Sequence, residues 1–235
     1  MNRREIIRFL ILKSIGNFLV LFALFGVGAT FGPALFFEVR YQLYQAQGIY
    51  YTIADTKEQK QIAQATQPPP DLPSLFFPSS KHQILVPTTT QFSLVIPKIG
   101  ANAKVFPNVD PSRSENYLPI LKQGVAQARG SAFPDQDGTV YMFAHSTDNF
   151  WDVGLYNAVF YLLKDLSRGD GVTIFYNAKR YDYVVTNIVI TDPNDIGYLT
   201  QSRATQRQVI LQTCWPPGTT WKRLLVIATP KESIK

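Results

Sequence analysis

The one cysteine of the chain, Cys214, stands in the stretch LQTCWPPGTTWKRLLVIA, which runs from Leu211 to Ala228. The apolar residues before it predict a strand, and the two prolines that follow cannot donate to a sheet ladder, so this strand must end near the thiol. After a Pro/Gly/Thr-rich loop, a second predicted strand opens with Lys222 and Arg223. This pairing suits acyl transfer, in which a thiol attacks a carbonyl carbon and a guanidinium stabilises the oxyanion or holds the substrate backbone.

A base for such a thiol is available at the end of another predicted strand. His145 directly follows the run Thr139 to Ala144 and is the only histidine of the predicted folded domain, since His82 lies in a proline-rich stretch and is interpreted as a solvated linker residue. A catalytic Cys/His pair is brought together in space rather than in sequence. On the residues alone, a buried structural cysteine, a structural histidine and a surface arginine paired with a carboxylate remain alternatives.

Composition limits the classes of function. The net charge is +6, but four of the basic residues precede the first apolar block, at Arg3, Arg4, Arg8 and Lys13. The remainder is only mildly basic and has no Lys/Arg run or RNA-binding aromatic signature, which argues against nucleic acid as a partner. A single cysteine excludes an internal disulfide and any multi-cysteine metal site, and an unpaired thiol in an exported chain indicates reactivity.

A membrane anchor is predicted near the N-terminus. Residues 14–37 contain no charged side chain and are longer than the roughly 20 residues that cross a bilayer as a helix. A cleaved signal peptide is the alternative, but Gly28 to Thr30 is only a weak cleavage site. The basic residues of 1–13 predict a cytoplasmic tail by the positive-inside rule. We therefore expect a single-pass plasma-membrane protein whose chain lies outside the cytoplasm after about residue 38.

The part outside the membrane divides into a connecting segment and a folded domain. Residues 38–88 are predicted to form a helical arm, as far as Gln67, and then a semi-rigid linker that begins with Pro68, Pro69 and Pro70. Residues 89–235 change to short runs rich in β-branched and aromatic residues, separated by turn signals, which predicts a closed or nearly closed β-barrel. The predicted strands are Phe92–Ile96, Ala103–Phe106, Thr139–Ala144, Val172–Tyr176, Tyr181–Thr191, Val209–Cys214 and Leu224–Thr229, with a short helix over Trp151–Leu166.

Several segments, in order, resemble the sortase family of membrane-anchored cysteine transpeptidases, over roughly residues 92 to 230. IPKIGANAKVF (Ile96–Phe106) resembles the first-strand signature of the family, and GVAQARGSAFPDQDGTVYMFAHS (Gly124–Ser146) resembles the stretch that ends in its catalytic histidine. FYLLKDLSRGD (Phe160–Asp170) resembles the following helix and turn, and YDYVV (Tyr181–Val185) resembles the central strand. TC followed by proline, and later RLLV, resembles the cysteine and arginine strands.

The resemblance implies a mainly β fold, a closed barrel of about eight strands with short helices, preceded by a transmembrane helix and a linker. It makes Cys214 the nucleophile, His145 the general acid and base, and Arg223 the cation that stabilises the oxyanion or positions the substrate. Thr213 matches a position that commonly shapes the substrate groove. Two positions depart from the family pattern: Gln127 stands where many relatives carry a histidine, and Ala144 replaces a common glycine.

The function implied by the resemblance is transpeptidation of surface proteins with a C-terminal sorting signal similar to LPXTG. Cys214 would cleave the signal through a thioester, and an amine of a cell-wall peptide or of a pilin lysine would resolve it, with no metal or organic cofactor required. Because the chain ends at Lys235, shortly after the last predicted strand, we expect an attachment enzyme rather than a pilin polymerase. The alternatives are a thiol protease that hydrolyses the same signal and a non-catalytic anchored β-barrel that binds surface-protein tails.

Overall fold

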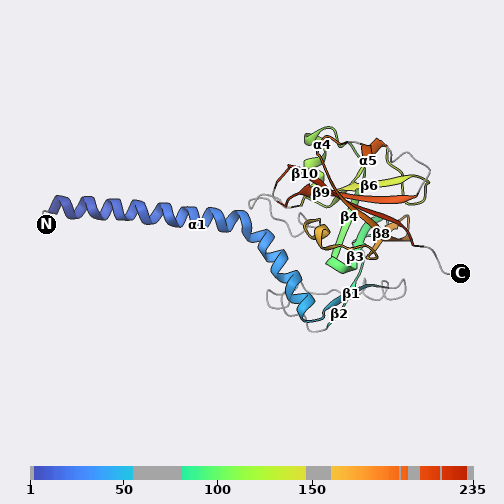
Figure 1. The fold of residues 1–235 in the computed structure, drawn as a ribbon, viewed down its shortest axis with the longest axis horizontal. Helices are drawn as coiled ribbons and strands as arrows, with labels where there is room; N and C mark the ends of the chain where they lie inside the picture. The colour runs from blue at the N-terminus through green and yellow to red at the C-terminus, as the bar shows by residue number, and fades with distance from the viewer. Residues whose placement is uncertain are drawn as a thin grey trace.

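The computed structural model describes residues 3–54, 81–146, 160–195, 197–200, 207–217 and 219–231. One long helix, α1 (Arg3–Ala46), extends away from a mainly β domain, and its C-terminal part bends to lie beside that domain (Figure 1). The stretch Arg3–Gly28 has a mean hydropathy of 2.1 and is long and apolar enough to cross a membrane.

Eight strands close into a barrel in the order β10-β8-β7-β3-β4-β5-β6-β9, which confirms the predicted closed, mainly β fold. Each predicted strand lies within a barrel strand or extends beyond it by a single residue. The barrel strand that was not predicted is β5, whose short sequence VAQA carries little β signal. The barrel strands are β3 (Phe92–Ile96), β4 (Ala101–Val109), β5 (Val125–Ala128), β6 (Thr139–Phe143), β7 (Gly171–Tyr176), β8 (Lys179–Thr191), β9 (Gln208–Trp215) and β10 (Lys222–Pro230).

Short helices connect the strands. Those among the described residues are η1 (Pro97–Ile99), α4 (Ser114–Leu121), η3 (Tyr161–Asp165) and α5 (Gly197–Thr200). The helix predicted over Trp151–Leu166 is described only at its end, where η3 is a 3-10 helix that buries Leu162 and Leu163; residues 151–159 lie outside the described residues.

Part of the barrel wall is buried on both of its faces. Inside the barrel, residues such as Leu94, Met142 and Leu211 form an inner core. A second cluster, which we call the outer layer, lies on the outside of the wall and comprises Val109, Leu121, Ala126, Ala128, Tyr141, Phe143, Ile210 and Leu225. Because β6 contributes to both clusters, all five of its residues are buried, which explains its continuous run TVYMF.

Strand directions define one end of the barrel, which we call the Cys214 end. Strands β6 and β9 are parallel and both finish there, β10 begins there, and β8 finishes there. Antiparallel pairing then requires that β7 begins and β3 finishes at the same end. The helices that adjoin those strand ends, η3 and η1, therefore also lie at the Cys214 end, whereas the β7–β8 hairpin lies at the opposite end.

The segment between the membrane helix and the barrel contains a small parallel sheet. The helix ends at Ala46, well before the predicted end of the arm at Gln67, and β1 (Tyr50–Ile53) then pairs with β2 (His82–Leu85). The ring of His82 stacks on Tyr50 with 5.0 Å between centroids, so this exposed histidine is part of the sheet rather than of a linker. Residues 55–80, with the proline run of the predicted linker, lie outside the described residues.

Gly124, just before β5, leaves no room for a side chain. A Cβ atom there would clash with the backbone carbonyl oxygen of Lys104, an atom that is fixed in β4. We expect Gly124→Ala to lower the free energy of unfolding by about 1–3 kcal/mol, as overpacking does elsewhere. Gly171→Ala is the matched control, because nothing lies within 4 Å of its Cβ position. Denaturant unfolding of the full chain in detergent measures both, and equal stabilities would contradict this packing.

Candidate functional site

Cys214 and Arg223 face each other across two paired strands. The antiparallel register of β9 and β10 sets Cys214 directly opposite Arg223. Residues opposed in this way project to the same face, with Cβ atoms about 4.5–5.5 Å apart. Both side chains are partly exposed. The predicted thiol and cation are therefore cross-strand neighbours that solvent can reach.

His145 follows the strand on the other side of β9. The parallel ladder of β6 and β9 ends with Phe143 opposite Gln212, and continuing that register sets His145 level with Cys214. Two hydrogen bonds extend the contact beyond the ladder: the Ala144 N–H donates to the Gln212 carbonyl oxygen at 3.2 Å, and Thr213 Oγ1 donates to the Ala144 carbonyl oxygen at 3.1 Å. The histidine and the cysteine thus leave adjacent, hydrogen-bonded strand ends.

The three groups share the outer face of the barrel wall. Leu225 and Phe143 belong to the outer layer, and side chains alternate along a strand. Arg223 lies two residues from Leu225, and His145 lies two residues after Phe143, so both project outward with Cys214. All three are half-buried. The candidate site is therefore a partly open surface over an apolar floor, rather than a cavity inside the barrel.

Thr213 projects the other way. Its side chain is 2% exposed, and its hydroxyl is used in the bond to the Ala144 carbonyl. The geometry favours a role in holding the strand of the cysteine against the residue before His145 over direct contact with a substrate.

Arg223 is held by backbone carbonyl groups of the loop before β10 and of the first residue of that strand. Its Nη1 donates to the carbonyl oxygens of Thr220 at 3.2 Å and of Lys222 at 3.1 Å. The adjacent Lys222 points elsewhere and forms an ion pair with Asp192 at 2.9 Å, at the end of β8. Of the two cations that open the strand, Arg223 is the one that lies opposite Cys214 in the register.

A tyrosine and glutamine pair lies beneath the site and was not predicted. The Tyr141 hydroxyl donates to Gln212 Oε1 at 2.6 Å, which links β6 to β9 on the outer face. Burial raises the pKa of Tyr141 well above its usual value, and the nearby charge of Arg223 opposes this shift. Gln212 lies two residues before Cys214, and Tyr141 lies four residues before His145. This even spacing along each strand is the sequence signal that could have identified the pair.

The departure at Gln127 has a structural explanation. Its side chain is fully buried in β5, where Nε2 donates to the Ser131 carbonyl at 3.1 Å and hydroxyl at 2.7 Å, and Oε1 accepts from the Asn108 N–H at 2.7 Å. Gln127 therefore fastens the turn after β5 and the end of β4. It is a structural residue away from the thiol.

Removing the Tyr141 hydroxyl tests the pair under the site. We expect Tyr141→Phe to lower the free energy of unfolding by about 1 kcal/mol, because the half-buried Gln212 loses its donor. A raised folded-state pKa stabilises the protein below the unfolded pKa of about 10, and this contribution is lost at higher pH. The difference between the variant and the parent should therefore shrink above pH 10.

Tyr117→Phe is the control, because the edge-on contact of that ring with Phe143, at 5.8 Å, survives the change. Chemical denaturation from pH 8 to pH 11 measures the variants. A Tyr141→Phe protein as stable as Tyr117→Phe at pH 8 would contradict the role of the hydroxyl.

Comparisons with known proteins give one consistent result. Sortase D of Bacillus subtilis (strain 168) is 26% identical over 132 residues, which are 55% of this chain and 58% of that protein, so the match spans less than two thirds of this relative. A pilus island 1 sortase C2 of Group B Streptococcus superposes with a TM-score of 0.51 at 18% identity, covering 60% of this chain and 73% of its own. Clostridium perfringens sortase C with the C-terminal cell wall sorting motif superposes with a TM-score of 0.50 at 23% identity. This match covers 60% of this chain and 70% of the Clostridium perfringens chain.

These solved structures share the fold of this chain. The family model of the Sortase domain matches residues 94–231, which include the strands of the candidate site. Since this match covers more than half of the sequence, the chain belongs to the sortase family.

Proposed function

We propose that this protein is a cysteine transpeptidase that cleaves a C-terminal sorting signal of surface proteins and joins the new carboxyl end to an amine. The observation that carries the proposal is the direct opposition of Cys214 and Arg223 in the β9–β10 register, with His145 leaving the adjacent strand end. Membership of the sortase family supports the same assignment of these three groups.

The groups divide the chemistry between them. The Cys214 thiolate, stabilised by the imidazolium of His145, attacks the carbonyl carbon of the scissile peptide bond, and Arg223 stabilises the oxyanion. The carbon–nitrogen bond then breaks as His145 donates its proton to the departing amine, which leaves an acyl thioester on Cys214. An incoming amine attacks the thioester, gives a proton to His145, and releases the thiolate as the new amide forms.

The proposed substrate is a surface protein with a sorting signal similar to LPXTG. Support comes from the similarly folded Clostridium perfringens sortase C, whose structure contains the C-terminal cell wall sorting motif. The acceptor is an amine of the cell envelope or of a pilin subunit. Attachment to the wall and polymerisation of pilins are the two outcomes to distinguish, and the likeness to a pilus-island sortase makes a pilin lysine one acceptor to test.

The proposed location is the outer face of the plasma membrane. The basic residues before the apolar part of α1 favour a cytoplasmic N-terminus. The barrel then lies outside, on one membrane-spanning helix. Enzyme and substrate share one membrane, which raises their effective concentration and makes a weakly binding, open site sufficient.

Product analysis distinguishes transpeptidation from hydrolysis and from simple binding. The full chain in detergent is incubated with a library of sorting-signal peptides, with and without a small amine. We expect a ligated product with the amine present and none from Cys214→Ala, since that variant lacks the nucleophile. Hydrolysed peptide that does not respond to the amine would indicate a thiol protease, and unchanged peptide would leave a non-catalytic binding protein.

Arg223→Lys tests the guanidinium. A lysine keeps the charge but cannot reproduce the planar fork of donors, so we expect kcat/KM to fall by about 10²-fold. Lys222→Arg is the matched control and should retain activity, because Lys222 pairs with Asp192 away from the thiol face. Near-parent turnover by Arg223→Lys would remove Arg223 from the mechanism.

A further inference from the structure

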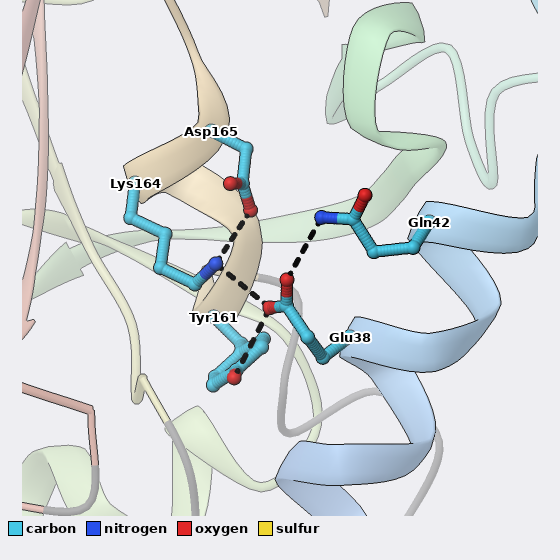
Figure 2. Close-up of polar contacts among 5 residues, drawn as sticks. All are labelled: Glu38, Gln42, Tyr161, Lys164 and Asp165. Carbon is cyan, nitrogen blue, oxygen red and sulfur yellow. Dashed lines mark hydrogen bonds and ion pairs between the residues drawn. The ribbon is translucent and has the colours of Figure 1, made fainter. Parts of the chain in front are cut away.

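Five side chains form a polar cluster between α1 and η3, which we call the Glu38 clasp: Glu38, Gln42, Tyr161, Lys164 and Asp165 (Figure 2). Lys164 Nζ donates to Glu38 Oε2 at 2.8 Å and to Asp165 Oδ2 at 2.9 Å. Gln42 Nε2 donates to Glu38 Oε1 at 3.1 Å, and the Tyr161 hydroxyl donates to Glu38 Oε2 at 3.4 Å. One lysine is therefore shared by carboxylates from two elements that are more than 100 residues apart in sequence.

The clasp is better shielded from water than an ordinary surface ion pair. The side chains of Lys164, Glu38 and Asp165 are 20%, 29% and 21% exposed. The hydrogen bond from Lys164, helped by Gln42, lowers the pKa of Glu38. Burial by itself would lower the pKa of Lys164, but its bonds to the two carboxylates outweigh this and raise it. The pair therefore stays ionised at neutral pH.

Aromatic contacts continue the same interface beyond the clasp. Tyr41, which follows Glu38 by about one turn of α1, packs against the inner core. Tyr44, on the next turn of the helix, is also buried, with 5% of its surface exposed. The ring of Tyr51 in β1 covers Gly100 at the end of η1, where a Cβ would lie 3.0 Å from the ring. The segment from Glu38 to Ile53 is therefore docked on η1 and η3 through both polar and apolar contacts.

This docking surface lies at the functional end of the barrel. Strand directions place η1 and η3 at the Cys214 end, and Glu38 directly follows residues 14–37, the predicted membrane span. In Figure 1, the membrane-spanning part of α1 leaves from the side of the domain against which the end of α1 lies. The clasp thus joins the base of the anchor to the end of the barrel that bears Cys214.

We propose that the Glu38 clasp holds the Cys214 end of the barrel in a fixed orientation toward the bilayer, so that the enzyme favours polypeptides anchored in the same membrane over soluble ones. This inference rests on the proposed transpeptidase function. A barrel on a free tether would present every side to the membrane in turn, whereas a docked barrel presents one. The partner that fits is a polypeptide whose apolar tail lies in the bilayer and whose cleavage site follows closely outside it.

The test uses the full chain in lipid vesicles and one sorting signal in two forms, a soluble peptide and the same peptide joined to a membrane-spanning segment. Lys164→Glu puts three carboxylates together and breaks the clasp. The double variant Glu38→Lys/Lys164→Glu restores it, because the exchanged charges again place one ammonium group between two carboxylates. We expect Lys164→Glu to cleave the anchored substrate about tenfold more slowly, with the soluble peptide within about twofold of the parent, and the double variant to recover.

Lys179→Glu is the control, since Lys179 is an exposed lysine at the opposite end of the barrel and should leave both rates unchanged. A second readout needs no activity: energy transfer from a fluorophore on Lys179→Cys, in a Cys214→Ala background, to acceptors on the lipid headgroups. With the clasp intact, we expect one narrow distribution of transfer efficiencies, because the barrel keeps one orientation. After Lys164→Glu we expect a broad distribution.

The two readouts separate the two proposals. Equal losses on both substrates, or unchanged rates together with an unchanged distribution, would overturn the orienting role of the clasp. If the parent cleaves neither substrate, the transpeptidase function fails, whereas the energy-transfer measurement still decides whether the clasp fixes the barrel.

Discussion

The backbone ladders on the two sides of β9 determine where every candidate catalytic group can lie. On one side, the antiparallel ladder with β10 brings Arg223 opposite Cys214; on the other, the parallel ladder with β6 brings His145 level with it. Because side chains alternate, a slip of one residue in β9 would turn Cys214 into the barrel and Thr213 outward. Burial on both faces of the wall makes such a slip costly, since it would exchange the inner core with the outer layer.

The same constraint explains why the site lies on the outside of a closed barrel. The interior is occupied by the apolar side chains of the inner core. The outer layer supplies a dry floor, and the Tyr141–Gln212 pair ties β6 to β9 under the thiol. The candidate site is thus a surface with an apolar floor rather than an enclosed cavity.

Much of the barrel could be predicted from local patterns. Runs of β-branched and aromatic residues identified seven strands, and the prolines after Cys214 correctly ended its strand. Strand β5 was missed because VAQA has almost no local preference, and its burial comes from neighbours on both faces. The sequence indicated a helical arm from residue 38, but not that Glu38 pairs with Lys164 of η3, because nothing local to Glu38 reveals this partner.

For the site, residue types and strand ends were predictable, and the partners were not. A cysteine, a histidine and an arginine at strand ends are visible in the sequence, but the register that opposes Cys214 to Arg223 depends on pairing across the whole sheet. The inward direction of Thr213 follows from that same register. Tyr141 reads as one more apolar residue of TVYMF until β9 is placed beside it, when its hydroxyl gains Gln212.

The most direct test of this account is the mass of the protein after brief reaction with a sorting-signal peptide and an acid quench. The account predicts one added acyl fragment, located by peptide mapping on Cys214 and discharged to a ligated product when an amine is added. An unmodified protein in the presence of cleaved peptide, or an acyl group on any other residue, would contradict it.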